Sequence, residues 1–303
     1  MFNNRTTVDR NGPLNAPTTA GRKQDGMGLR INTNVQALAA QRNLGVSNLR
    51  QQSSLEKMAS GTRISKAADD SAGLAISEKM RADIRSLRQD SRNANDGISL
   101  VQVAEGGMNE VGNILTRFRE LSIQAASDTI GDKERGFINK EVQQLRAEVD
   151  RISATTEFNG HKLLAGQGEK LEIQVGLNNS PENDRFVFDT QKMKTSLEAL
   201  GLTDINTESK EAAQTNLAKI DSAITSLSEN RSEIGALQNR LGSSVQNLAI
   251  YEENLSAARS RIYDVDMASE SSEMTKNSIL SQAGTSVLSQ ANSNAQMALK
   301  LLG

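Results

Sequence analysis

The feature that most constrains the fold of this 303-residue chain is an apolar pattern with steps of three and four residues. It extends over residues 80–118, with only Ser91 and Glu105 as polar members, and returns over residues 217–262. Residues spaced in this way share one face of an α-helix. A helix over residues 77–126 would be about 75 Å long at ~1.5 Å per residue. The pattern therefore predicts long helices packed side by side.

The composition agrees with helices of this kind. Only 36% of the residues are hydrophobic and 3% aromatic, which is lean for a globular core but sufficient for heptad seams. The 35 basic and 37 acidic residues give a net charge of -2, so the chain lacks the basic field that attracts nucleic acid or anionic lipid. No run approaches the ~18 apolar residues of a membrane helix. The absence of cysteine excludes disulfides and thiolate metal sites.

The first helix is predicted over about residues 33–60. The side chains of Asn32-Thr33-Asn34 can accept hydrogen bonds from its first backbone N–H groups, and Gly61 can take a positive φ after its last turn. A connector, residues 60–77, separates it from the long second helix. The pair Asp69-Asp70 in this connector is interpreted as helix capping and dipole compensation, not as an acid/base or metal site.

The second helix, residues 77–126, is predicted to end in a short turn at residues 127–131. Asp132 is then expected to cap a third helix. Because the turn is so short, this helix must run antiparallel to the second. Its apolar seam consists of Ile138, Val142, Leu145, Val149 and Ile152.

The period then changes from helical to alternating. Apolar residues alternate with polar ones at Leu171, Ile173 and Val175 and again at Phe186 and Phe188. Two such runs joined by a polar loop predict a β-hairpin at about residues 171–188. A turn at Leu197–Leu202, containing Gly201, is expected to lead back to the last long helix, which begins near Glu208.

The final segment, Met267–Leu302, has a narrow, Ala-rich apolar stripe and a surface of Ser, Gln, Asn and Thr. The stripe consists of Leu280, Ala283, Val287, Ala291, Ala295 and Leu299. Isolated helices gain most of their stability from packing, so this helix needs a partner. The matching Ala/Gln/Asn-rich run Ile31–Met58 is the natural one. The gain from such narrow stripes is small, and both ends are expected to be disordered in a lone subunit.

The predicted fold class is mainly α. It is an elongated bundle of long antiparallel helices with a small β-hairpin, together with a terminal two-helix coiled coil formed by the N- and C-terminal segments. Residues 1–27 carry Pro13 and Pro17 and no periodicity, and they are predicted to be a disordered extension. They also lack the apolar segment of a signal peptide.

Residues capable of chemistry are scarce. His161 is the only histidine and is interpreted as a loop residue after Asn159-Gly160. Gly166-Gln167-Gly168 precedes a strand instead of following one, so it is not a phosphate loop. Tyr251 and Tyr263 lie on a heptad helix without a polar cluster around them. We therefore predict no catalytic, cofactor or metal site, and a building block instead of an enzyme.

Several sequence motifs resemble those of bacterial flagellins, in order and with the spacing of that family. They are INTNVQALAAQRNL from Ile31, SGTRISKAADDSAGLAIS from Ser60, SRNANDGISLVQVAEGGMNEV from Ser91, LTRFRELSIQAA from Leu115, TEFNGHKLL from Thr156, QVGLNN from Gln174, SRIYDVDMA from Ser260 and SQAGTSVLSQAN from Ser281. The resemblance covers nearly everything after Gly28. It implies a subunit that polymerises into the flagellar filament, in a short form without variable surface domains. Flagellins usually begin at the equivalent of residues 27–31, so Met27 is expected to be the physiological start.

The resemblance also implies a division into layers. Residues 28–71 and 264–303 would form an inner filament-core layer, and residues 72–263 an outer helical bundle that includes the hairpin. The residues expected to pack in the filament core are Ile31, Val35, Leu38, Leu44, Leu49, Leu280, Val287, Leu288, Ala291, Leu299 and Leu302.

Partners follow from the same resemblance. They are further copies of the chain and sibling flagellins, an export chaperone on the C-terminal helix, and the filament-cap and hook-junction proteins. Export through the flagellar type III apparatus would place the protein in the extracellular filament. A contact with the innate receptor of an animal host is implied for Leu115, Arg117, Glu120, Leu121 and Gln124, with Phe118 at an otherwise aliphatic position.

Two other structural functions were weighed. A hook–filament junction protein shares the terminal helices, but the central motifs match flagellin continuously. An intracellular coiled-coil scaffold would carry charged e and g positions at its ends, where this chain has Ser, Gln and Asn.

Overall fold

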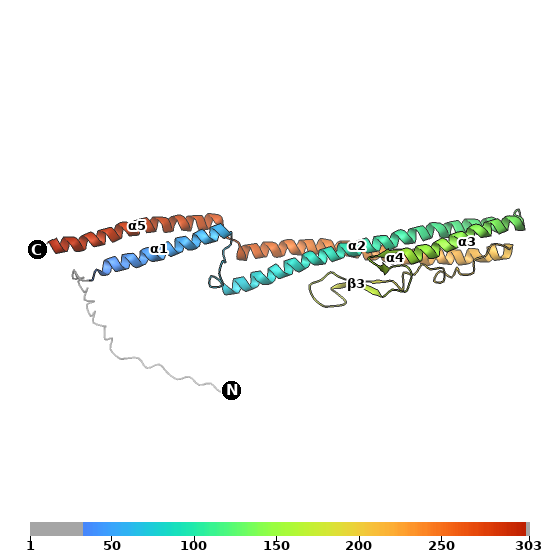
Figure 1. Cartoon of the computed structure of the whole chain (residues 1–303), viewed down its shortest axis with the longest axis horizontal. Coiled ribbons are helices and arrows are strands. Elements are labelled where there is room, and N and C mark those ends of the chain that lie inside the picture. The colour runs from blue at the N-terminus through green and yellow to red at the C-terminus, as the bar shows by residue number, and fades with distance from the viewer. Residues whose placement is uncertain (1–32, 301–303) are drawn as a thin grey trace, which may run out of the picture. The chain divides into compact units, whose positions relative to one another are not determined.

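The computed structural model describes residues 33–300, without the side chains of residues 295 and 298–300. Over this range the chain is mainly α, as predicted (Figure 1). Its helices are α1 (Val35–Ser60), α2 (Ser71–Ala125), α3 (Asp132–Thr155), α4 (Lys210–Tyr263) and α5 (Met267–Lys300). The predicted disordered extension at residues 1–27 lies outside the described residues, as do Ile31 and Leu302.

The described residues form two compact units. One contains α1 and α5, and the other extends from Ser60 to Asp266 and is called the bundle unit here. The predicted divisions at 71/72 and 263/264 lie inside the bundle unit, because its connector and the end of α4 pair with each other. Thr62 forms a β-bridge with Asp264, and the backbone N–H of Arg63 donates to the carbonyl of Tyr263 at 2.7 Å.

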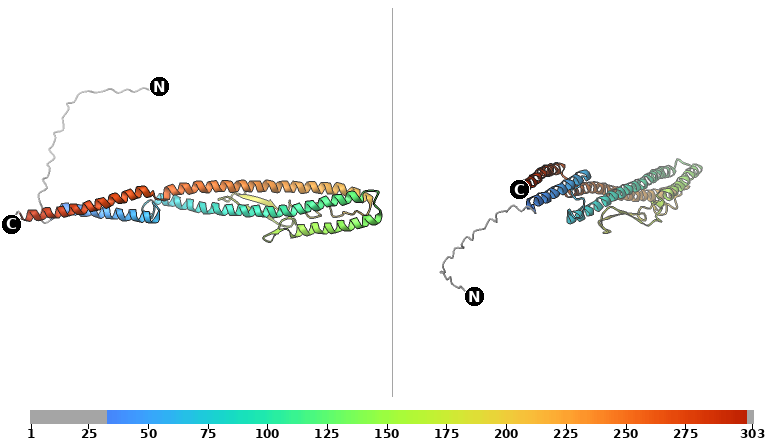
Figure 2. Two further views of the ribbon diagram at one scale, coloured as in Figure 1. Left: turned by 90° about the horizontal axis from the view of Figure 1, so that it is seen from above. Right: turned by 60° about the vertical axis from the view of Figure 1, so that its left-hand side comes forward.

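Within the bundle unit, α2 and α4 run antiparallel along most of their length (Figure 2). Arg88 and Arg119 of α2 form ion pairs with Glu252 and Asp221 of α4, which fixes the register. Helix α3 folds back on α2, as the short turn predicts. The predicted seams supply the core, whose largest side chains in α2 are Leu87, Met108, Leu115, Phe118 and Leu121.

Helix α2 begins six residues before the predicted start at Ser77. The Oδ1 atom of Asp70 accepts a hydrogen bond from the backbone N–H of Gly73 at 2.8 Å, so Asp70 is the N-cap. Residues 71–76 carry little apolar periodicity, and the cap determines the start instead. The capping role predicted for the pair Asp69-Asp70 is confirmed for Asp70 alone. Asp69 accepts from the backbone N–H groups of Ser65 and Lys66 at 3.1 and 2.9 Å, so it holds a turn of the connector and not the end of a helix. Gly61 has φ 69°, the positive value predicted for it.

The prediction that Asp132 caps α3 is wrong. Gly131 occupies the cap position and makes no side-chain hydrogen bond. Asp132 is already in the first turn, where its Oδ1 atom accepts from Nη1 of Arg135 at 2.8 Å. The carboxylate of Asp132 therefore holds the buried Arg135 side chain and does not accept from the first backbone N–H groups of α3.

The predicted hairpin is present as β3 (Lys170–Gln174) and β4 (Arg185–Asp189). Leu171 pairs with Phe188 and Ile173 with Phe186, so their side chains point to one face of the hairpin. A second, smaller hairpin was not predicted. It joins β1 (Glu157–Phe158) to β2 (His161–Lys162) through Asn159-Gly160, both with positive φ. Asn-Gly is the favoured pair for this two-residue turn, so the interpretation of His161 as a loop residue was wrong.

Candidate assembly surface

Helices α1 and α5 lie side by side and meet mostly through small and polar side chains (Figures 1 and 2). Among the half-buried and buried residues of each helix, one set keeps steps of three and four. In α1 this set consists of Ala37, Ala40, Leu44, Ser47, Gln51, Ser54 and Met58, and in α5 of Met274, Asn277, Ser281, Gly284, Leu288 and Ala291. This set is called the α1–α5 seam below. It has the heptad spacing of a coiled coil but few large apolar residues.

Three contacts fix the antiparallel direction of the pair. The Nδ2 atom of Asn34 donates to the carbonyl of Ala291 at 2.9 Å. The hydroxyl of Ser281 lies 2.9 Å from Oδ1 of Asn48. A Cβ atom added to Gly284 would lie 3.3 Å from the Leu44 side chain, so glycine allows a close approach there. Asn34 also caps α1, because its Oδ1 accepts from the N–H of Ala37 at 3.0 Å, as predicted.

Asn277 is an unfavourable member of the α1–α5 seam. Its side chain is 1% exposed, and neither Oδ1 nor Nδ2 has a hydrogen-bond partner in the part of the chain that the structure describes. A buried polar group without a partner costs ~1–3 kcal/mol. The seam is therefore weaker than its length suggests.

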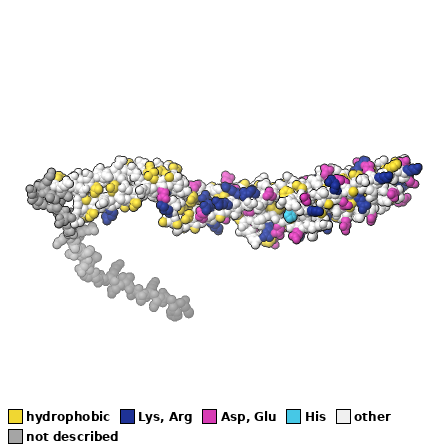
Figure 3. Space-filling view, in the orientation of Figure 1, with side chains coloured by type: hydrophobic (Ala, Val, Ile, Leu, Met, Phe, Trp, Pro, Cys, Tyr) yellow, Lys and Arg dark blue, Asp and Glu magenta, His cyan; other side chains and the backbone are white. Residues whose placement is uncertain are grey.

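Several large apolar side chains of this pair face away from the seam. Val35, Leu38, Leu49, Leu280 and Val287 are 46% to 67% exposed. Figure 3 shows hydrophobic atoms on the surface of α1 and α5, with few charged side chains among them.

The prediction that the apolar stripe of α5 packs against α1 is therefore wrong. Ala291 is buried in the seam, but Leu280, Ala283 and Val287 are exposed. The contact uses a neighbouring track of smaller residues, because these let the two backbones approach each other. Of the other predicted assembly residues, Leu44 and Leu288 are half-buried in the seam. The side chain of Leu299 lies outside the described residues.

The exposed residues of α1 form a track of their own. Val35, Leu38, Val46 and Leu49 are all more than 40% exposed, and Arg42 lies on the same line. In the heptad of the seam these positions fall on the side of the helix opposite to α5. This face needs a cover that the described chain does not supply.

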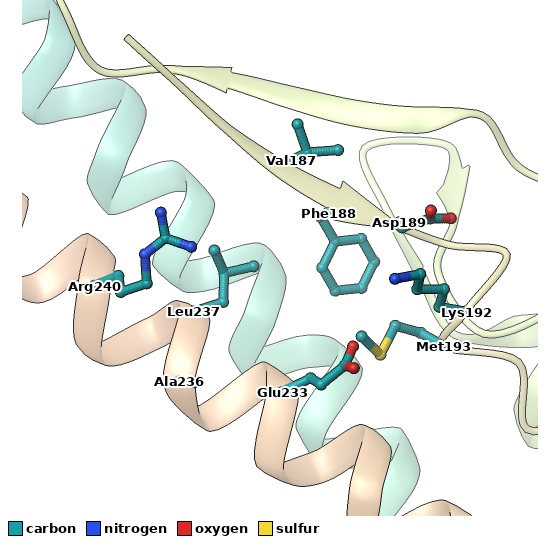
Figure 4. Close-up of a pocket in the computed structure, with 9 residues that line it drawn as sticks. All are labelled: Val187, Phe188, Asp189, Lys192, Met193, Glu233, Ala236, Leu237 and Arg240. Carbon is teal, nitrogen blue, oxygen red and sulfur yellow. The ribbon is translucent and has the colours of Figure 1, made fainter. Parts of the chain in front are cut away.

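The bundle unit has a second exposed apolar feature, a groove of ≈ 280 Å³ between β4 and α4 (Figure 4). Phe188 and Met193 are buried at its floor, 1% and 6% exposed. Arg240 at one end stacks on the Phe186 ring, 4.7 Å from its centroid. The residues lining this β4–α4 groove are Val187, Phe188, Asp189, Lys192, Met193, Glu233, Ala236, Leu237 and Arg240.

The segment expected to contact a host receptor has two faces. Leu115 and Leu121 are 0% and 1% exposed, so their side chains are core residues and cannot touch a partner on this surface. Arg117, Glu120 and Gln124 are exposed on the opposite face of α2. Arg117 donates to Glu120 and to Glu141 of α3 at 2.8 Å, and both carboxylates raise the pKa of its guanidinium.

No three His, Cys, Asp or Glu side chains within residues 33–300 could together hold a metal ion. Within the same range, none of the helices is long and apolar enough to cross a membrane. Burial raises the pKa of Asp90, and the charge of Asp184 adds to this effect.

Comparison with known proteins agrees with this arrangement. A family model described as the bacterial flagellin N-terminal helical region matches residues 31–169, from before α1 to the residue that precedes β3. A second, described as the bacterial flagellin C-terminal helical region, matches residues 217–302, which contain most of α4 and all of α5. The chain belongs to the bacterial flagellin family.

Individual flagellins match over nearly their whole length. The flagellin of Halalkalibacterium halodurans is 46% identical over 274 residues, which cover 90% of this chain and 99% of the relative. The flagellin of Bacillus subtilis is 41% identical over 303 residues, covering 90% and 100%. A solved protein of Vibrio parahaemolyticus, described as flagellar hook-associated, shares the fold with a TM-score of 0.53, 12% identity and coverage of 65% and 100%.

The flagellin motifs fall on the parts of the fold that join elements as well as on the helices. SGTRISKAADD contains the Gly61 turn, the connector turn held by Asp69 and the Asp70 cap. QVGLNN begins at the end of β3 and continues into the hairpin loop. Residues 170–216, which carry the β3–β4 hairpin and the strand side of the β4–α4 groove, are matched by neither family model.

Proposed function

We propose that this chain is a structural subunit that polymerises into a bacterial flagellar filament and so serves motility. The observation that supports it most directly is the exposed apolar face of α1 and α5, together with membership of the flagellin family. A relative from Treponema phagedenis, 42% identical over 288 residues, is named a flagellar filament 33 kDa core protein. Apolar faces that one chain leaves in water become buried when further copies pack against them.

In the filament, residues 28–71 and 264–303 would form the inner core layer and residues 72–263 the outer layer. Val35, Leu38, Leu49, Leu280 and Val287 would then contact other copies, while Leu44, Leu288 and Ala291 hold α1 and α5 together. Ile31 is assigned to the same layer by its place in the first flagellin motif, and Leu299 and Leu302 by their place in the C-terminal region that the family model matches. Sibling flagellins could enter the same lattice.

The test is polymerisation of the purified protein. Addition of a precipitating salt such as ammonium sulfate is expected to give straight or helical filaments by negative-stain microscopy, and pelletable protein in the ultracentrifuge. Val35→Asn and Leu49→Asn remove the outer α1 face without touching the seam, and they are expected to stop filament formation while leaving helix content unchanged. Amorphous or soluble wild-type protein under all salt conditions would contradict the proposal.

The route to the filament is part of the same proposal. Export would use the flagellar type III apparatus, with a chaperone covering the apolar side of α5 until the subunit reaches the growing end. The filament would lie outside the cell, between a hook-junction protein and a cap protein. Co-purification of the chain with a flagellar export chaperone, and its loss when Leu280 and Val287 are changed to Asn, would support this order of events.

A host receptor contact is proposed for the exposed face of α2. Arg117, Glu120 and Gln124 would make it, whereas Leu115 and Leu121 only position the helix from the core. Monomeric protein is expected to activate a receptor reporter cell, and Arg117→Ala is expected to weaken the response. The exposed Arg85→Ala serves as the matched control. A silent wild-type monomer would refute this contact without affecting filament assembly.

A further inference from the structure

Phe137 is an aromatic side chain that the bundle unit leaves in water. It is 67% exposed, more than any other large apolar residue described in that unit. Its neighbour Ile138 occupies the core position of α3 at 8% exposure, so Phe137 must face outward. Lys140, one turn away, places its Nζ 5.7 Å from the centroid of the ring. A single exposed apolar residue is common and decides nothing by itself.

The β4–α4 groove has the size and chemistry to receive such a ring. The volume of the groove is ≈ 280 Å³, just below the ~300–1,000 Å³ that is usual for a ligand pocket. This volume leaves room for one aromatic side chain. The floor offers the Phe188 ring and the Met193 sulfur, both of which make favourable contacts with the edge or face of an aromatic ring. The groove opens at the surface beside Ala236, which is exposed (Figure 4).

One charged side chain beside each feature has no ion-pair partner among the described residues, and the groove is also lined by Lys192 and Arg240. Glu233 lines the groove and forms no ion pair with any residue that the structure describes. Lys140, beside Phe137, likewise has no carboxylate partner within residues 33–300. If Phe137 entered the β4–α4 groove, Lys140 could therefore lie next to Glu233 and pair with it.

The two features cannot meet within one chain. The ion pairs Arg88–Glu252 and Arg119–Asp221 put Ala236 level with about residue 104 of α2. The Arg117–Glu141 pair puts Phe137 level with about residue 121. The difference of about 17 helical residues corresponds to roughly 25 Å along the bundle at ~1.5 Å per residue.

We propose that Phe137 of one copy inserts into the β4–α4 groove of a second copy, with Lys140 beside Glu233. The inference rests on the proposed filament function and names one contact between copies in it. Because the two surfaces differ, the contact is heterologous and repeats from copy to copy without closing, as a filament requires. Parallel copies joined in this way are displaced by roughly 25 Å along the bundle.

The first experiment measures the critical concentration for growth from wild-type filament seeds. Phe137→Ala removes the anchor and Ala236→Phe fills the groove, and each is expected to raise the critical concentration about tenfold or more. Tyr251→Ala removes another exposed aromatic from α4 and is the matched control, expected to grow like wild type. Both changed side chains are exposed, so thermal unfolding should stay the same.

A charge exchange tests whether the two features face each other. Lys140→Glu and Glu233→Lys are each expected to weaken growth, and the double variant is expected to recover it. Reversal of the exposed Lys219 to Glu serves as the control. A double variant no better than the worse single variant would overturn the pairing of these residues.

The decisive measurement uses the absence of cysteine from the chain. Lys140→Cys combined with Glu233→Cys keeps the Phe137 anchor and can form a disulfide only between copies, because Cα atoms joined by a disulfide lie less than ~7 Å apart. Oxidised filaments are expected to give a ladder of covalent multimers in denaturing electrophoresis, and either single variant no more than dimers. Filaments without a ladder would overturn the contact and leave the proposed function intact. If wild-type protein formed no filaments, the proposed function would fail first, and the contact with it.

Discussion

At the scale of single residues, Arg135 determines where α2 ends and α3 begins. Its Nε atom donates to the carbonyl of Ala125 at 2.9 Å and its Nη2 atom to that of Ser127 at 3.1 Å. Nη1 donates to Asp132. The side chain is only 10% exposed, and its planar fork satisfies the last carbonyls of α2 in the interhelical turn.

Replacement of Arg135 by Ala should therefore lower the free energy of unfolding by about 2–3 kcal/mol, because buried carbonyls lose charged donors. Arg135→Lys keeps the charge without the fork and is expected to recover less than half of the loss. Thermal unfolding followed by circular dichroism measures both. Equal stability of the Ala variant and wild type would show that water replaces the guanidinium without cost.

Asp90 is a second residue whose surroundings determine its chemistry. It is 6% exposed, and its Oδ2 atom has no hydrogen-bond partner within the described residues. Burial, and after it the charge of Asp184, raise the pKa of Asp90 above 3.8. The native state therefore binds this proton more tightly than the unfolded chain does, so stability falls as pH rises from about 3.8 through the raised pKa.

Asp90→Asn removes the buried charge and is expected to raise the stability by about 1 kcal/mol at pH 7. The advantage should disappear in acid, where wild-type Asp90 is itself neutral. Unfolding by urea at pH 7 and again near the usual carboxyl pKa compares the two conditions. A stabilisation that did not depend on pH would point to packing instead of charge.

Much of this residue-scale detail is beyond what the sequence could predict. The cap formed by Asp70 could be interpreted correctly, because a cap depends on residues close by in sequence. The role of Asp132 could not, because it is decided by Arg135 and by carbonyls of another helix. The Asn159-Gly160 turn carried a clear local signal, and the small hairpin could have been predicted from it.

At the scale of elements, α1 and α5 show why an apolar pattern can point to the wrong face. Each helix carries two tracks with steps of three and four. The track with the larger residues, such as Leu280 and Val287, was expected in the helix pair, but the structure uses the track with Asn277, Ser281 and Gly284. In α2 and α4 there is one dominant track, and there the predicted seam is the observed core.

The buried Asn277 gives a direct test of the weakness of this pair. Asn277→Leu exchanges an unpaired amide for apolar contact and is expected to stabilise the α1–α5 seam by about 1–3 kcal/mol. Hydrogen exchange on the monomer should show slower exchange in α5 for the variant than for wild type. Unchanged exchange would mean that Asn277 finds a partner, such as water, in solution. The control is Ser286→Leu, on the exposed side of α5.

At the scale of the whole molecule, the two units differ in how much each depends on further copies. The bundle unit has a continuous core of Leu, Val, Ile and Phe side chains from α2, α3, α4 and the β3–β4 hairpin. The α1–α5 seam buries few large side chains, while ordering its backbone costs ~1–2 kcal/mol per residue. We therefore expect the bundle unit to fold in the monomer, and α1 and α5 to be stabilised chiefly by the filament.

Removal of residues 284–303 separates these two contributions. The deletion takes away Leu288 and Ala291 from the seam and Val287 from the exposed face, but no residue of the bundle unit. The truncated chain is expected to keep the thermal transition of the bundle unit and to remain soluble. It should not sediment under salt conditions that polymerise wild type, and it should not extend wild-type seeds. The control is a deletion of residues 1–26 from a chain that keeps residues 284–303, and it is expected to polymerise. Pelleted filaments of the truncated chain would mean that the bundle units alone can hold the lattice, through contacts such as Phe137 in the β4–α4 groove.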